Sequence, residues 1–166
     1  MELAWAKPLV EEALAAVDRG EGMTLEEYRA RMAERFGKLE ALHLIKINNL
    51  SDVSTLKNAR TLKRIELEWL PHVETLPDLS GLTRLEELEI SSMKSLRDVS
   101  AIARAPALRF LGLWDCKSLT PQNFECLIGH PTLKRLNFGI GRLKDNEKVA
   151  AMFPAEMTQS VSYRIT

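Results

Sequence analysis

Two Glu-x-Glu motifs contain the residues of this chain whose type and spacing could do chemistry. Glu66 and Glu68 form the first motif, and Glu87 and Glu89 form the second. Two neighbouring carboxylates can act as general acid and general base when a sheltered pocket separates their pKa values. The alternating apolar residues around both motifs predict strands of an open sheet, which offers no such pocket. We therefore expect no catalysis by these carboxylates.

Other catalytic and cofactor motifs are missing from the sequence. It contains no phosphate-binding glycine loop, no dinucleotide fingerprint, no H-E-x-x-H motif and no G-x-S-x-G motif. The two cysteines, Cys116 and Cys126, have no Cys or His at finger-like spacing, so they predict no zinc site. We interpret both as small buried side chains of a reduced protein, and His43 as an exposed polar residue. The sequence thus predicts a non-enzymatic protein without a metal or cofactor.

The composition is that of a globular domain without a bulk electrostatic preference. Of the 166 residues, 45% are hydrophobic and 28% are charged, and 23 Lys and Arg balance 23 Asp and Glu. This balance argues against nucleic acid as a partner, because clustered Lys and Arg supply most of that affinity. No apolar run is long enough to span a membrane, and residues 1–8 lack a signal-peptide pattern. We expect a cytoplasmic protein that binds neither nucleic acid nor membrane.

One apolar pattern of the form Leu-x-x-Leu-x-Leu recurs at a nearly constant step. Copies begin at Leu39, Leu62, Leu85 and Leu108, each 23 residues after the last, and a fifth begins at Leu133, 25 residues further on. A constant period in the twenties predicts a repeat architecture in which each copy contributes one strand. The next apolar position of the first four copies is filled by Ile47, Leu70, Met93 and Cys116.

The segments between the strands are predicted to return the chain to the start of the next strand. In the first three copies they contain Asp-x-Ser turns that begin at Asp52, Asp78 and Asp98. The fourth return is longer, and 121–128 should form a true helix. A fifth outer helix is expected at 145–153, where Pro154 stops it.

Caps are expected at both ends, since an open-ended repeat array exposes its core. Two amphipathic helices before the first repeat fit that need, and a final strand at 161–165 should close the far end. In that strand Val161 would lie beside Leu136, continuing the step of 25 residues. The expected organisation is one structural domain with a helical N-terminal cap at 1–38, repeats at 39–140, and a C-terminal capping helix and strand at 141–166.

These repeats resemble the leucine-rich repeat family over about residues 39–140. Residues 50–56 look like the short bacterial internalin type, and 116–120 look like the cysteine-containing type. The resemblance implies an α/β fold, a right-handed solenoid with a parallel sheet of about six strands on its concave face. Two features depart from the family. The lack of a secretion signal argues against the adhesive role of exported internalins, and the usual asparagine is replaced by Ile47, Leu70 and Met93.

Outward side chains of stacked strands should form columns, because side chains alternate along a strand. The three predicted columns are Ala41, Arg64, Glu87, Phe110, Arg135; then His43, Glu66, Glu89, Gly112, Asn137; then Ile45, Glu68, Ser91, Trp114, Gly139. Arg64 should offset Glu87, whereas Glu66 and Glu89 have no evident basic neighbour in their column. The candidate partner-binding residues are Arg64, Glu66, Glu68, Trp69, Glu87, Glu89, Phe110, Trp114, Asp115, Arg135 and Asn137.

Aromatic side chains flanked by charge are typical of protein-binding hot spots. The sequence therefore favours a module whose partner, another protein with a basic surface, docks on the concave face. By analogy, an immunity protein that neutralises a basic toxin would be such a binder. The alternative is a scaffold or homo-oligomer that uses its ends or its convex helices, for example by pairing through the edge strand at 161–165, and the oligomeric state is left open. The simplest interpretation is a solvated strand face whose aromatics stabilise their neighbours.

Overall fold

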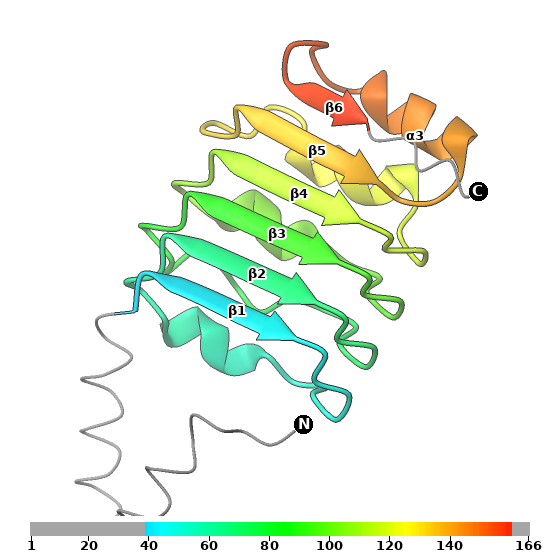
Figure 1. Ribbon diagram of the computed structural model, residues 1–166. Coiled ribbons are helices and arrows are strands. Elements are labelled where there is room, and N and C mark those ends of the chain that lie inside the picture. Colours follow the sequence, from blue (N-terminus) through cyan, green and yellow to red (C-terminus); the bar gives the residue numbers. More distant parts are fainter. Residues whose placement is uncertain (1–38, 161–166) are drawn as a thin grey trace, which may run out of the picture. The chain divides into compact units, whose positions relative to one another are not determined.

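The computed structural model describes residues 39–160, and this part of the chain is an α/β unit built on one parallel sheet. Six strands lie side by side in the order of the sequence (Figure 1). They are β1 (Ala41–Ile45), β2 (Arg64–Glu68), β3 (Glu87–Ser91), β4 (Phe110–Trp114), β5 (Arg135–Gly139) and β6 (Thr158–Ser160). The predicted α/β class and parallel sheet are confirmed. The helices expected within 1–38 and the strand expected at 161–165 lie outside the described residues.

The predicted columns match the observed strand register. Each strand pairs in parallel with the next one, and Arg64 lies opposite Ala41 on one side and Glu87 on the other. The second column likewise passes from Glu89 through Gly112 to Asn137. The 23-residue period therefore set the side-chain neighbours correctly across β1 to β5.

The inward residues of these strands form the core. Outward positions stay at least partly exposed except at Gly112 and Gly139, which are buried. Inward positions are at most 2% exposed at Ile65, Leu67, Leu88, Ile90, Leu111, Leu113, Leu136 and Phe138. Leu42 and Leu44 in β1 are half-buried and pack against the same cluster. This alternation is what a strand with one covered face requires.

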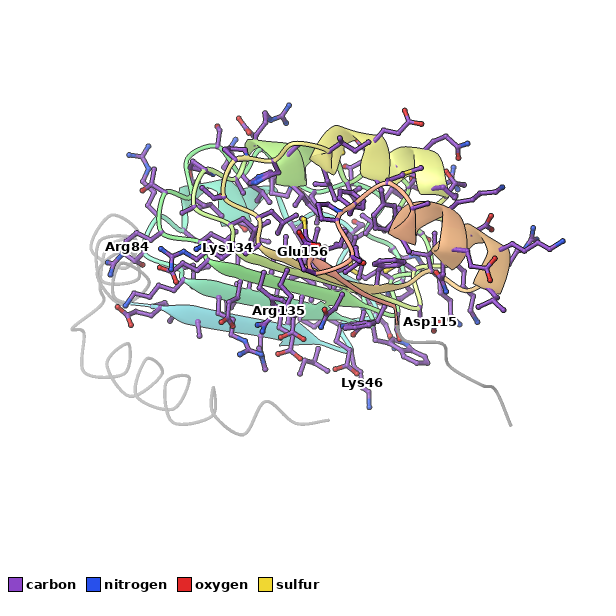
Figure 2. The ribbon with its side chains drawn as sticks, turned by 90° about the horizontal axis from the view of Figure 1, so that it is seen from above. Lys46, Arg84, Asp115, Lys134, Arg135 and Glu156 are labelled. Atoms are coloured by element: carbon purple, nitrogen blue, oxygen red, sulfur yellow. The ribbon has the colours of Figure 1, made fainter. Side chains whose placement is uncertain are left out.

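Short helices in the returns cover the core on one side of the sheet (Figure 2). They are the 3-10 helices η1 (Ser54–Asn58), η2 (Ser100–Arg104) and η3 (Pro121–Leu127), and the α-helix α3 (Leu143–Ala150). The expectation of a true α-helix at 121–128 is wrong. Pro121, Phe124 and Leu127 are all buried, and a helix with three residues per turn places this spacing on one face.

The last step between paired strand residues is shorter than the predicted 25 residues. Helix α3 begins and ends earlier than the expected 145–153, and the Met157 N–H then donates to the carbonyl of Pro154 at 2.9 Å. As a result Leu136 pairs with Thr158, and the expected pairing of Leu136 with Val161 is wrong by three residues. The step of 25 came from the copy that contains η3, and it does not apply to a return built on α3.

A left-handed backbone residue ends each of the first four strands. Lys46, Trp69, Ser92 and Asp115 have φ between 47° and 56°. The N–H of each one donates to the carbonyl of the last residue of the next strand, as in Asp115 to Gly139 at 2.8 Å. Because four copies share it, this conformation belongs to the repeat geometry, and it turns the chain out of the sheet while extending the ladder by one bond.

Apolar residues occupy the position where the family usually has asparagine. Leu70, Met93 and Cys116 are fully buried there, whereas Ile47 is 39% exposed. Backbone bonds close these turns instead, such as Val73 N–H to the carbonyl of Leu70 at 3.3 Å. In the fifth copy a buried Asn146 accepts the N–H of Ile140 through Oδ1 at 3.0 Å.

The Asp-x-Ser motifs form the predicted turns. In the second copy, the backbone N–H of Ser80 and its hydroxyl donate to the Asp78 carboxylate at 3.1 and 2.9 Å. Arg104 adds a bond from Nε at 3.0 Å. These donors hold the pKa of Asp78 below its ordinary value, the backbone N–H of Ser80 contributing most.

Leu111 tests the core because its side chain is 0% exposed in the middle of β4. We expect Leu111→Ala to lower the free energy of unfolding by about 2–5 kcal/mol through lost burial and a residual cavity. The matched variant Leu143→Ala changes a side chain that is 62% exposed. It should change the free energy of unfolding by less than about 0.5 kcal/mol. Urea denaturation followed by circular dichroism measures both, and equal effects would contradict the assignment of the core.

Asp78 tests the turns through its titration. A lowered pKa in the folded state means that the ionised carboxylate stabilises the fold above its ordinary pKa, and that this contribution is lost as the pH falls through the lowered value. Ser80→Ala removes the hydroxyl donor and should raise the pKa of Asp78 toward the ordinary value. Carbon-detected NMR titration of the carboxyl group measures it. Ser91→Ala is the control, and an unchanged pKa in Ser80→Ala would refute the proposed cause.

Candidate functional site

The sheet surface opposite the return helices carries the outward side chains of the strands, and we call it the open face. Of the eleven candidate residues, nine lie on it: Arg64, Glu66, Glu68, Glu87, Glu89, Phe110, Trp114, Arg135 and Asn137. Trp69 and Asp115 follow β2 and β4 directly. Figure 2 shows Arg135 on the side of the sheet away from the helices and Asp115 at the strand ends.

Four glutamates on β2 and β3 form what we call the acidic patch: Glu66, Glu68, Glu87 and Glu89. Arg64 contacts two of them, Glu87 at 3.2 Å and Glu89 at 2.7 Å. His43 on β1 contacts Glu66. The expected pairing of Arg64 with Glu87 is confirmed. The expectation of no basic neighbour in the same column is wrong for Glu66, which His43 precedes there. Glu89 finds its basic partner outside its column, because the long Arg64 side chain reaches diagonally across the sheet.

The acidic patch keeps a net negative charge despite these contacts. Within the part of the chain that the structure describes, Glu68 takes part in no ion pair. Arg64 is about half exposed, and ion pairs of such exposure contribute only about 0–1 kcal/mol each. Two like charges near 6 Å still repel by roughly 0.7 kcal/mol in water. A positively charged group placed over the patch would therefore be attracted.

Aromatic side chains surround the acidic patch, and two of them already hold a cation of the same chain. Lys94 lies 5.3 Å from the ring centroid of Trp69, and Arg135 lies 4.6 Å from that of Phe110. Trp69 remains 43% exposed, whereas Phe110 and Trp114 are half-buried. Of the three predicted aromatic anchors, Trp69 is thus the most accessible.

The indole of Trp114 lies back across the open face. A Cβ on Gly112 would lie 3.0 Å from Nε1 of Trp114 and 3.3 Å from Cγ of Glu89. The missing side chain at Gly112 therefore provides the space that the indole occupies beside the acidic patch.

The two remaining polar candidates are less engaged with the patch. Asp115 contacts Lys117 at 3.5 Å beyond the end of β4. Asn137 is half-buried on β5, and its Oδ1 is shielded from solvent without a hydrogen-bond partner among the described residues.

Sequence reasoning missed an exposed apolar cluster at the ends of β1 and β2. Ile45 is 42% and Ile47 is 39% exposed, beside Trp69. Ile45 pairs with Glu68, and the N–H of Lys46 donates to the carbonyl of Glu68 at 2.9 Å. The sequence could have shown the exposure of Ile45, because this isoleucine lies in an outward column. It could not have shown that of Ile47, because the same position is buried in the later copies.

Other reactive groups lie away from the open face. Burial raises the pKa of the Cys116 thiol to about 11. Cys126 is exposed, so the prediction that both cysteines are buried is wrong for it, because its position falls between Phe124 and Leu127 on the outward side of η3. Among residues 39–160, no group of three or more His, Cys, Asp or Glu is placed to hold a metal ion.

The helices in the described part of the chain are all too short or too polar to cross a membrane. No protein-family model and no curated protein matches this chain.

Gly112 offers a test of the position of Trp114. In Gly112→Ala the new methyl group forces the indole to move by a few tenths of an ångström, which should shift the NMR resonance of its Nε1–H. The free energy of unfolding should change by less than about 1 kcal/mol, because the methyl group meets side chains at the surface. The control is Gly81→Ala, whose Cβ would make an ordinary 3.6 Å contact with the carbonyl of Lys57. An indole resonance that moves equally in both variants, or in neither, would contradict this geometry.

Proposed function

We propose that this chain is a leucine-rich repeat protein that binds another protein through its open face and catalyses no reaction. Five strands lie in one register, and each of the first four is followed by a residue in the same left-handed backbone conformation. Both features support a solenoid. The right-handed sense follows from the preference of parallel strands joined by crossover connections.

The single observation that carries the binding proposal is the exposed Trp69 beside the acidic patch. Trp69 is 43% exposed and has a left-handed backbone conformation, which is unfavourable for a bulky side chain. A residue that only faced solvent would not need to be tryptophan. Ile45 and Ile47 extend the apolar area next to it. Tryptophan is among the residues most enriched at the energetic centres of protein interfaces, so we assign Trp69 the role of anchor.

The acidic patch supports a partner with a basic surface. Its charges would mainly raise the association rate and select among partners, while the aromatic and aliphatic contacts supply most of the affinity. An immunity protein that blocks a basic toxin, for example a nuclease, would need these properties. This more specific assignment rests on analogy.

The competing scaffold or homo-oligomer rests on the edge strand expected at 161–165, which lies outside the described residues. Sedimentation at several protein concentrations separates the two functions. A protein that stays monomeric at every concentration must act on a different protein, which favours the binding function. Self-association that grows with concentration favours the scaffold.

The binding function is tested by reversing charge in the acidic patch. Glu66→Lys combined with Glu89→Lys should weaken retention of the partner from native lysate by roughly tenfold or more, since attraction becomes repulsion at two positions. Circular dichroism should be unchanged, because both side chains are on the surface.

A matched control carries the same change of net charge on the other layer. Glu125 in η3 and Glu147 in α3 are exposed, and Glu125→Lys with Glu147→Lys should retain the partner like the unchanged protein. Equal retention by all three proteins would reject the open face as the binding surface.

A further inference from the structure

An open pocket lies at the amino ends of β3, β4 and β5. Its volume is about 460 Å³, and it is lined by Glu86, Glu87, Arg109, Phe110, Lys134 and Arg135. We call it the basic pocket. This volume falls within the range of about 300–1,000 Å³ that is usual for ligand sites, and it would accept a side chain or a short segment of a partner.

Backbone bonds join the three residues that supply the cations of the basic pocket. The N–H groups of Lys134 and Arg135 both donate to the carbonyl of Arg109, at 2.9 and 3.0 Å. The Arg135 guanidinium lies 4.6 Å from the ring centroid of Phe110, which keeps it over the open face. Lys134 lies at the end of the sheet opposite to Asp115 (Figure 2).

These cations lack carboxylate partners. In the described residues, none of Arg109, Lys134 and Arg135 takes part in an ion pair. Of the two glutamates in the lining, Glu87 is already held by Arg64 at 3.2 Å. Like charges that line one pocket repel each other, by roughly 0.7 kcal/mol in water at a separation of about 6 Å. An anionic group in the pocket would relieve this repulsion.

The open face therefore has charges of both signs, with the acidic patch on β2 and β3 and the cations of the basic pocket at β4 and β5, while Glu87 belongs to both regions. With strands about 4.8 Å apart, the centres of the two regions are separated by two strand spacings, or about 10 Å. Complementary charges of both signs admit a partner in one orientation and repel it when it is reversed.

We propose that the basic pocket receives an acidic side chain of the partner protein while basic residues of the same partner lie over the acidic patch. This proposal rests on the proposed function and adds the orientation of the partner: its Asp or Glu lies about 10 Å from its Lys or Arg, along the direction from β5 to β2.

The test uses NMR of the full chain with two capped peptides, tetraglutamate and tetralysine, as probes. Tetraglutamate should shift the amide resonances of Phe110 and Arg135, and tetralysine should shift those of Glu66 and Glu89. Both effects should vanish in about 1 M salt, where the Debye length falls to about 3 Å. Sodium phosphate serves as a third probe, because it is a small anion without a peptide.

Variants then assign the response to the pocket. Lys134→Glu with Arg135→Glu should weaken tetraglutamate binding by roughly tenfold or more and leave the tetralysine response in place. Arg109→Gln with Lys134→Gln is a milder second variant that keeps Arg135 on Phe110. As a matched control, Arg97→Glu with Lys144→Glu reverses two exposed cations outside the pocket and should leave both responses unchanged.

Three results would overturn the proposal: no tetraglutamate response, an equal loss in the control variant, or phosphate binding more tightly than tetraglutamate. The last result would mark a small-anion site. If the pocket variants keep tetraglutamate binding while Glu66→Lys with Glu89→Lys abolishes partner retention, the basic pocket is rejected and the proposed function stands.

Discussion

Hydrogen bonding between parallel strands in a single register keeps the two surfaces of this protein distinct. The ladder continues past the strands through the left-handed residues, as when the N–H of Trp69 reaches the carbonyl of Ser91 at 3.0 Å. A slip of one residue would turn every leucine outward and every glutamate inward. The apolar core and the charged open face are therefore two results of the same pairing, and the core enforces the register on which the open face depends.

Outside the strands, polar side chains bind each copy to the one before it. Thr132 donates its hydroxyl to the carbonyl of Leu108 at 2.8 Å, and Asn123 donates from Nδ2 to the carbonyl of Arg97, also at 2.8 Å. Within the fifth copy, Asn146 Oδ1 accepts a bond from the N–H of Ile140. Backbone groups left unpaired away from water would be costly, so these bonds let the returns pack closely on the sheet. The core can then be almost entirely apolar.

The open face is largely self-paired, and this shapes how it could bind. Arg64 is shared between two glutamates, and Lys94 lies over Trp69. A partner has to replace such contacts, so each charge adds little net affinity while mismatched charges remain unfavourable. We infer that charge sets the orientation of the partner, and that the exposed apolar groups near Trp69 supply the binding energy.

The sequence alone determined the class of fold, the positions of β1 to β5 and the columns of the open face, because burial with a period of two inside a 23-residue repeat leaves one register. It did not determine the type of helix at 121–127 or the pairing of Leu136 with Thr158, since both depend on how a return fits the core. Tertiary structure also decided that Arg64 reaches Glu89 and that Arg109 joins Lys134 in a pocket. Long flexible side chains choose their partners by distance across strands, and a periodic pattern along the chain carries no record of that choice.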